Sequence, residues 1–305
     1  FQFLAGGDAP FLFYASLVAL FSVLYITVGG FGAVIRTDML QVLLMFTGFI
    51  ILLFFAAGEF GGIGSVWSGV SDVHRDITGG NTIQYIIVWF FIALWTFVDP
   101  SFHQRAAAAE SPETAKKGIF VSIAFWIAFD FLTAFSGLYA FAILGPGLEQ
   151  PVMAYPLLAD QILPLGFKGL FFISLLATIM STLDSYLFIS GQTLGRDYLS
   201  AYFPRTRPTL LTRISILISA LLGILLIIIY PSVIDLWYVI GSVFIPGLLI
   251  PVLGIYLKLF TIRPGFVFLS IIGCTAVSLF WLVLGTLYPT ETGGYAYMGL
   301  EPFYP

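Results

Sequence analysis

Charged residues are scarce in this chain. Asp, Glu, Lys and Arg make up 9% of its 305 residues, whereas soluble globular domains contain about 25%. Hydrophobic residues account for 59% of the chain, and the mean hydropathy is +1.02. This composition argues against a water-soluble protein, and no nucleic-acid partner is expected. It predicts instead a protein embedded in the lipid bilayer.

Cysteine and histidine are also nearly absent. The single cysteine, Cys274, excludes a disulfide framework and a cysteine-based metal site. His74 and His103 fall in loops between apolar segments, which argues against an intramembrane serine protease. A phosphate-cradling glycine motif and a repeated channel-filter sequence are both missing, so neither an ATP-driven pump nor a channel is favoured. Residue 1 is not Met and opens a loop before the first apolar segment, so we interpret the chain as a fragment.

Apolar segments dominate what remains. Eight of them approach the ~20 residues needed to cross the hydrocarbon core. They cover residues 10–30, 33–57, 83–99, 118–144, 168–190, 209–231, 234–258 and 264–287. Their length and lack of alternation exclude a transmembrane β-barrel. The sequence therefore predicts an all-α membrane protein of about eight transmembrane helices.

Basic residues predict the orientation of these helices. With the loop at residues 99–117 in the cytoplasm, all of the 12 Lys and Arg residues except Arg75 and Lys168 fall on the cytoplasmic side. Such an imbalance is typical of the positive-inside rule. It predicts a multi-pass protein of the plasma membrane with both ends of this chain extracellular.

Two loops are predicted to contain helices of their own. Ser111 followed by Pro112 and Glu113 is a typical helix start, with a capping hydroxyl, proline at the first position and an acid in the first turn. Residues 151–164 could form a short amphipathic helix on the outer face or an ordinary surface loop.

Hydroxyl groups and a carboxylate gather in the middle of segment 168–190. Thr178, Ser181, Thr182 and Ser185 are spaced i, i+3, i+4, i+7 and share one helical face, and Asp184 lies beside them. Burying such groups in hydrocarbon costs several kcal/mol, which favours a functional site. Several oxygens on one face suit a small hard cation. Alternatively, these hydroxyls bond carbonyls four residues earlier or join helices.

Three segments resemble the sodium:solute symporter family. Residues 29–41, Gly-Gly-Phe-Gly-Ala-Val-Ile-Arg-Thr-Asp-Met-Leu-Gln, resemble its GG-x-x-AV-x-x-TD-x-x-Q signature. Residues 99–109, with Gln104-Arg105 and an alanine run, resemble its discontinuous-helix end and the following loop. Residues 177–182, Ala-Thr-Ile-Met-Ser-Thr, resemble its A-A-x-M-S-[ST] sodium-site helix. The three motifs occur in the order typical of the family.

The resemblance implies an inverted-repeat (LeuT-like) transporter fold. On that map residues 1–305 form a single transmembrane domain. Residues 10–57 are the last two helices of the first repeat, residues 83–258 the second repeat, and residues 264–287 an accessory helix. The first core helices are missing, including the broken helix that supplies part of the sodium and substrate sites. The implied function is symport of a small organic solute with Na⁺ as the coupling ion, or with H⁺ instead.

The resemblance also implies ion-binding residues. Ser181, Thr182 and the backbone carbonyl of Thr178 match the principal sodium positions. Asp184 and Ser185 lie at or beside positions where some members hold a second cation, and Asp38 is the acid of the residues 29–41 signature. Gln41 lies one turn beyond Asp38 on the same face. Alternatively, Asp38 pairs with Arg36 or another cytoplasmic basic group.

Substrate contacts are expected from three further places. Trp95, Thr96 and Asp99 precede Pro100, at the place where the family unwinds a cavity-lining helix; alternatively, Trp95 is an interfacial anchor and Asp99 caps the next helix. Tyr238 and Ser242 lie in a segment interrupted by Gly and Pro and face either the cavity or a neighbouring helix. Asp130 lies mid-span and must be protonated, paired or facing water.

An intramembrane aspartyl protease is the main rival function. Asp130 and Asp184 lie on separate helices, and such a protease needs two close acids that share a proton. The sequence before Asp184 is Ser-Thr-Leu, however, and lacks the expected Gly-x-Gly. The transporter is therefore the favoured interpretation.

Overall fold

The computed structural model describes residues 10–229, 232–288 and 295–303. The remaining residues include both chain ends, predicted to be extracellular, and the last two positions of the predicted segment 209–231. Within the described ranges the secondary structure is helical, with no strand beyond an isolated bridge between Tyr297 and Leu300. Seven helices in these ranges are long and apolar enough to cross a membrane. The first contains two of the eight predicted segments, so the predicted all-α membrane fold is confirmed.

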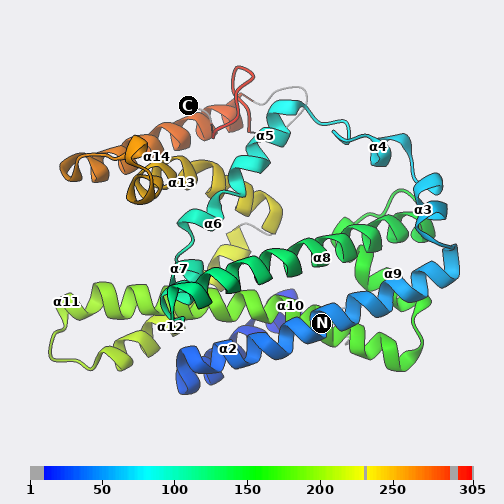
Figure 1. Ribbon diagram of the computed structural model, residues 1–305, viewed down its shortest axis with the longest axis horizontal. Coiled ribbons are helices and arrows are strands. Elements are labelled where there is room, and N and C mark those ends of the chain that lie inside the picture. The colour runs from blue at the N-terminus through cyan, green and yellow to red at the C-terminus, as the bar shows by residue number, and fades with distance from the viewer. Residues whose placement is uncertain (1–9, 230–231, 289–294, 304–305) are drawn as a thin grey trace. The chain divides into compact units, whose positions relative to one another are not determined.

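The chain folds as two compact units, each assembled from two stretches of sequence. The first unit contains α2 (Phe11–Phe60), α3 (Ile63–Gly69), α4 (Asp72–Arg75), α8 (Pro112–Leu144), η1 (Pro151–Met153), α9 (Ala154–Ile162), α10 (Leu165–Gln192), the π-helical η2 (Thr193–Leu199), α11 (Ser200–Tyr202) and most of α12 (Pro208–Ile229) (Figure 1). The second unit contains α5 (Ile83–Ile92), α6 (Trp95–Val98), α7 (Pro100–Ala107), α13 (Val233–Tyr256), η3 (Lys258–Phe260) and α14 (Pro264–Leu287).

Helix α2 is two helical segments joined at Gly30. Gly30 has φ 59° and ψ −153°, a conformation that side chains with a Cβ rarely adopt. The break separates the predicted segments 10–30 and 33–57. Beside it, Arg213 Nε donates to the Thr27 carbonyl oxygen at 2.9 Å. This bond supplies a partner to a carbonyl group near the helix break.

Aromatic packing holds α2, α8, α9 and α10 together in the first unit. Phe49 contacts Tyr155 and Phe171 edge to face, with centroids 5.4 and 5.5 Å apart. The hydroxyl of Tyr155 donates to Thr133 O at 3.0 Å, and burial raises the pKa of this tyrosine. Tyr139, which is fully buried, donates to Gly61 O at 2.8 Å. Buried rings with satisfied hydroxyls give this unit a specific core.

The two predicted loop helices are present. Helix α8 begins with Ser111 Oγ accepting from Thr114 N at 3.1 Å and Pro112 in its first turn. Helix α9 lies inside the predicted 151–164 segment, and its Leu158 and Ala159 are buried. The amphipathic alternative for this loop is therefore confirmed.

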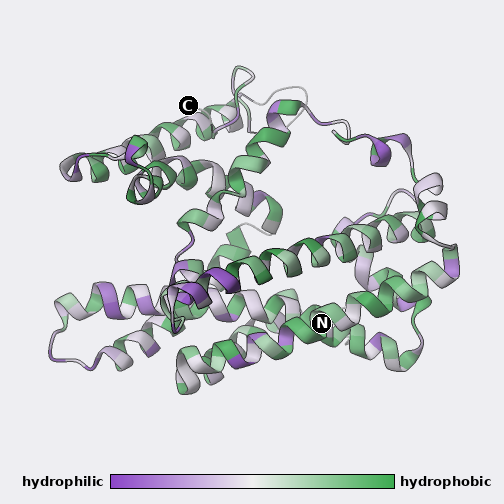
Figure 2. Ribbon diagram, viewed as in Figure 1, coloured by the Kyte–Doolittle hydropathy of each residue, from purple (hydrophilic) through white to green (hydrophobic). Residues whose placement is uncertain are grey.

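Many large apolar side chains remain exposed on the long helices. Figure 2 shows hydrophobic residues along most of α8, where Phe120, Val121 and Phe131 are exposed. A soluble protein would not tolerate so extensive an apolar surface, whereas lipid covers it in a membrane protein.

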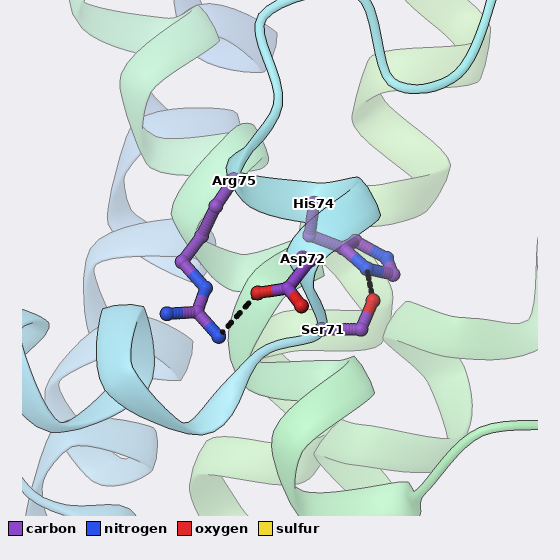
Figure 3. Close-up of polar contacts among 4 residues, drawn as sticks. All are labelled: Ser71, Asp72, His74 and Arg75. Atoms are coloured by element: carbon purple, nitrogen blue, oxygen red, sulfur yellow. Dashed lines mark hydrogen bonds and ion pairs between the residues drawn. The ribbon is translucent and has the colours of Figure 1, made fainter.

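A polar turn follows α3 and ends, at Arg75, the first of the two sequence stretches that form the first unit. In α4 Arg75 forms an ion pair with Asp72 at 3.0 Å, and Ser71 Oγ lies 2.8 Å from His74 Nδ1 (Figure 3). The Asp72 side chain is 98% exposed, so the pair contributes at most about 1 kcal/mol. The His74 ring packs on Phe141 of α8, with centroids 4.1 Å apart. These polar contacts therefore lie within the turn, and the His74 ring packs against α8.

The predicted span 83–99 is divided in the second unit. Helix α5 ends at Ile92, α6 covers four residues, and α7 begins at Pro100. The break at Asp99-Pro100 was predicted, but the earlier one at Ala93–Leu94 was not. There Leu94 N bonds Phe91 O and Phe97 N bonds Leu94 O, the i to i+3 pattern of a tightened helix.

Candidate functional site

The predicted ion-binding residues lie between α2 and α10. The two helices run antiparallel here. Phe49 and Gly48 of α2 lie against Phe171 and Ser174 of α10, whereas the earlier part of α2 faces the later part of α10. A Cβ at Gly48 would lie 1.8 Å from Ser174 Oγ. The helices therefore approach closely and bring polar side chains on both into contact.

Asp184 is at the centre of this contact. It is fully buried, and its Oδ2 accepts from Gln41 Nε2 at 3.2 Å. Ser22, on the other side of the α2 break, is also fully buried. Its hydroxyl is near enough to interact electrostatically with the Asp184 carboxyl, although the geometry is not that of a regular hydrogen bond. Asp184 Oδ1 and Gln41 Oε1 are buried without a hydrogen-bond donor among the described residues.

Asp38 and Ser181 form a second contact between the same helices. Ser181 Oγ donates to Asp38 Oδ1 at 3.1 Å. One helical turn later, Ser185 Oγ donates to the carbonyl oxygen of Ser181 at 2.9 Å. Asp38 therefore binds the predicted sodium helix directly. Together with Asp184, Gln41 and Ser22 these residues form one cluster, hereafter the α2/α10 polar cluster.

The other predicted sodium residues are arranged differently. Thr178 Oγ1 donates to Ser174 O at 2.9 Å, the i−4 bond considered as the alternative for its hydroxyl. Thr182 lies on α10 with its side chain exposed. Its hydroxyl is therefore accessible from outside the described first unit, on the opposite side of α10 from buried Asp184.

The α2/α10 polar cluster has the chemistry of a cation site. Carboxylate, amide and hydroxyl oxygens are ligands for hard cations. The fully buried carboxyl group of Asp184 is costly unless a cation or a proton balances it. The orphaned Asp184 Oδ1 and Gln41 Oε1 fit such an ion. No group of three His, Cys, Asp or Glu residues suited to a metal occurs in the described ranges, so hydroxyl and amide oxygens would have to complete the coordination.

Predicted substrate residues gather in the second unit. Asp99 is fully buried and caps α7, with Oδ1 accepting from Ser101 N at 2.7 Å. Its Oδ2 accepts from Trp95 Nε1 at 2.9 Å. The capping role considered as the alternative is therefore confirmed, and the same carboxylate fixes the indole ring. Thr96 is exposed and donates to Ala93 O at 3.0 Å.

Tyr238 and Ser242 lie on α13 within an aromatic cluster. Tyr238 packs with Val88, Ile92 and Ile245, and Trp95 lies against the same group. Its hydroxyl donates to Glu301 Oε2 at 2.5 Å. Ser242 is fully buried one turn later. Tyr238 and Trp95 therefore belong to one cluster, and Ser242 lies one turn after Tyr238 on α13.

Asp130 joins neither group. It lies exposed on α8, and Thr133 Oγ1 donates to its backbone carbonyl oxygen at 3.1 Å. The Asp184 carboxyl is buried against Gln41. The geometry therefore gives no support to a shared-proton pair of Asp130 and Asp184.

Comparison with known protein families identifies the family of this chain. The family model described as the sodium:solute symporter family matches residues 12–273. The chain belongs to the sodium:solute symporter family. This membership and the long apolar helices support a multi-pass membrane protein and do not favour the protease alternative.

Several curated symporters are similar to the chain. It is 29% identical over 227 residues to the sodium/glucose cotransporter of Vibrio parahaemolyticus, covering 63% of this chain and 41% of that protein. It is 25% identical over 278 residues to the osmoregulated proline transporter OpuE of Bacillus subtilis, covering 86% and 56%. A sodium/pantothenate symporter of Haemophilus influenzae is 26% identical over 199 residues, covering 62% and 41%. The chain spans about half the length of these relatives.

The sequence did not identify Ser22 or Glu301 as members of the candidate sites. Ser22 is a lone hydroxyl among Ala19, Val23 and Ile26 on the buried face of α2, and this polar break in an apolar face was a usable signal. Glu301 follows the last helix by more than ten positions, and no local pattern connects it with Tyr238. Gln41 was noted on the Asp38 face, but its bond to Asp184 depends on the helix packing.

Proposed function

We propose that this chain forms part of a sodium-coupled symporter that moves a small organic solute across the plasma membrane by alternating access. The observation that carries the proposal is the α2/α10 polar cluster, in which two carboxyl groups contact buried amide and hydroxyl groups inside apolar helices. Membership in the symporter family supports sodium as the ion. The relatives named for glucose, proline and pantothenate support a small organic solute.

Sodium binds at two places on α10 in this proposal. Ser181, Thr182 and the carbonyl of Thr178 contribute to the first site, and the exposure of Thr182 leaves its hydroxyl available for a ligand. Asp38, Asp184 and Ser185 contribute to a second cation site beside it. Ser181 contacts Asp38 and lies one turn from Asp184, so it belongs to both sites and links their occupancies. Binding of one ion then favours binding of the other through a coupling free energy.

Substrate contacts are proposed for the second unit. Trp95 and Tyr238 belong to one cluster there, Ser242 lies one turn after Tyr238, and Asp99 holds Trp95 in place. Thr96 is a secondary candidate in this unit, and Asp130 is a separate candidate exposed on α8 of the first unit. Sodium binding completes the substrate site, and closure over the substrate commits both to transport.

The proposed architecture is an inverted repeat. Residues 10–57 would end the first repeat, residues 83–258 would form the second, and α14 would be accessory. The interruption of α5 and α6 at Ala93–Leu94 supports a discontinuous helix in the second repeat. The distribution of Lys and Arg supports a cytoplasmic loop at residues 99–117.

Uptake measurements test the proposal. The full-length protein containing these residues is reconstituted in vesicles, and accumulation of candidate solutes is compared with an inward sodium gradient, with potassium in its place, and with a proton gradient. Accumulation that requires sodium supports the proposal. Accumulation driven equally by a proton gradient in sodium-free buffer favours the proton-coupled alternative, in which Asp184 carries the proton. No accumulation of any tested solute class under either gradient contradicts symport.

A further inference from the structure

A cavity in the second unit combines aromatic rings with carboxylates. Its volume is about 410 Å³, and it lies between α5, the first turns of α13 and the segment after α14. Its side-chain walls are Tyr85, Trp89, Tyr238, Tyr295, Asp235 and Glu301. The size falls within the range of small-molecule sites, which measure about 300–1,000 Å³.

Four aromatic rings make up one part of the wall. Tyr238 lies between Tyr85 and Tyr295, with ring centroids 6.3 and 5.6 Å apart and interplanar angles of 20° in both pairs. Trp89 is tilted against Tyr238, with centroids 5.7 Å apart. Ring faces carry negative electrostatic potential, and they attract cations within about 6 Å.

Two acids give the cavity its charge. Glu301 Oε2 accepts a hydrogen bond from the Tyr238 hydroxyl at 2.5 Å, which keeps this carboxylate beside the rings. Asp235 lies at the start of α13, where its N–H donates to Ser232 Oγ, and its side chain is exposed. Among the residues that the structure describes, those lining the cavity include no Lys, Arg or His. The site therefore has a net negative charge with no basic group to neutralise it.

A turn closes another side of the cavity. Gly80, Asn81 and Thr82 line it, and the turn is fixed by Asp76, which accepts from the Thr78 hydroxyl and from Gly80 N. These hydrogen bonds, the Thr78 bond first, lower the pKa of the Asp76 carboxyl. Asp76 therefore stays charged at neutral pH and holds the turn in place.

We propose that this cavity binds the ammonium group of a small organic cation or zwitterion. Aromatic rings beside two acids, with no basic residue among the described lining residues, favour a weakly hydrated cation over an anion. They also favour it over a neutral polyol, whose hydroxyl groups would leave the negative charge uncompensated. Because Tyr238 is also among the proposed substrate residues, the cavity specifies the substrate class of the transporter, and in this respect the inference rests on the proposed function.

Binding to the full-length protein in detergent tests the inference. Choline is titrated by calorimetry, with myo-inositol as a neutral compound of similar size. We expect choline to bind at least about tenfold more tightly than myo-inositol, because the inositol lacks the charge that the rings and acids favour. Equal binding of the two compounds, or no choline binding at about 10 mM, a concentration at which even millimolar affinity is visible, would overturn the inference.

Variants locate the binding. Glu301→Gln and Trp89→Leu should each weaken choline binding at least about fivefold, whereas Glu59→Gln and Trp67→Leu, on exposed positions of the first unit, should not change it. Asp235→Asn alters an exposed carboxylate and should weaken choline binding about threefold or more. It tests the site independently if the variant at half-buried Trp89 or Glu301 fails to fold. Unchanged affinity in Asp235→Asn and in the folded variants would overturn the assignment.

Failure of this inference is distinguishable from failure of the proposed function. If uptake requires sodium but choline neither binds nor competes with the solute, the symporter stands and the ammonium site does not. If choline binds through these residues but no solute accumulates on a sodium gradient, the site stands and the transport proposal does not.

Discussion

Gln41 donates its side-chain N–H to Asp184 at 3.2 Å across 143 positions of sequence. Both side chains are buried, with Gln41 7% exposed and Asp184 fully enclosed. The Gln41 amide supplies a hydrogen-bond donor to a carboxyl group that is buried between two apolar helices. This bond links the proposed second cation site to α2, so the chemistry of Asp184 depends on the packing of two helices.

Removal of the two sodium-site hydroxyls should weaken sodium binding. In Ser181→Ala combined with Thr182→Ala, the first site loses two oxygen ligands and Asp38 loses its hydrogen-bond donor. We expect the sodium concentration for half-maximal uptake to rise at least about tenfold, equivalent to about 1.4 kcal/mol. Ser190→Ala, which removes an exposed hydroxyl from the same helix, is the control and should leave it unchanged. An unaltered sodium dependence in the double variant would remove these residues from the ion site.

Neutralising Asp184 should change the number of coupled ions. Asp184→Asn keeps an acceptor for Gln41 but removes the charge that balances a second cation. We expect the Hill coefficient for sodium to fall toward one, and half-maximal activation by the remaining ion to need a higher sodium concentration because the coupling between the sites is lost. Asp197→Asn removes an exposed carboxylate outside the proposed sites and serves as the matched control. A Hill coefficient equal to that of the parent protein would contradict a cation at Asp184.

A side chain at Gly195 should destabilise the first unit. A Cβ there would lie 2.6 Å from the backbone of Leu211 and Thr212, which cannot move aside as a flexible side chain would. We expect Gly195→Ala to lower the thermal unfolding temperature in detergent, with a loss of about 1–3 kcal/mol from overpacking. Gly223→Ala on α12 has open space around its Cβ and should be neutral or stabilising by up to about 1 kcal/mol. Equal melting temperatures for the two variants would contradict the close contact between η2 and α12.

Loss of the Asp99 carboxylate should release both α7 and Trp95. Asp99→Ala removes the cap on Ser101 N and the acceptor for the indole N–H. We expect a destabilisation of about 1–2 kcal/mol from the cap alone and a raised KM for the solute, because Trp95 lies in the proposed substrate region. Asp99→Asn retains an oxygen acceptor and should recover most of the stability. A changed stability with an unchanged KM would restrict Asp99 to a structural role.

The helices were predictable because hydropathy and local capping fix them. The apolar runs give the spans, Ser111-Pro112 gives the start of α8, and Gly29-Gly30 gives the division of α2. The double break in residues 83–99 was only half predicted. Asp99-Pro100 is a local signal, whereas Ala93 and Leu94 are ordinary helix residues whose tightened turn no local propensity indicates.

The polar contacts were less predictable than the residues that make them. The hydroxyl spacing identified Ser181 and Ser185, but their partners depend on which helix packs against α10. Asp38 was expected to lie near Arg36 or near a second cation, and its observed bond to Ser181 connects it with the predicted sodium helix. The link between Tyr238 and Glu301 joins distant segments and could not be inferred from spacing.

Gly30 separates the two residues of α2 that reach Asp184. Ser22 precedes the break and Gln41 follows it, yet both lie beside the same carboxyl group. In a straight helix Ser22 and Gln41 would move as one rigid body, whereas the break at Gly30 allows the angle between the two segments of α2 to vary. Any change of that angle alters the distances from Ser22 and Gln41 to Asp184 by different amounts. The proposed cation at Asp184 would therefore restrain this angle, and its release would allow one segment of α2 to tilt against the other.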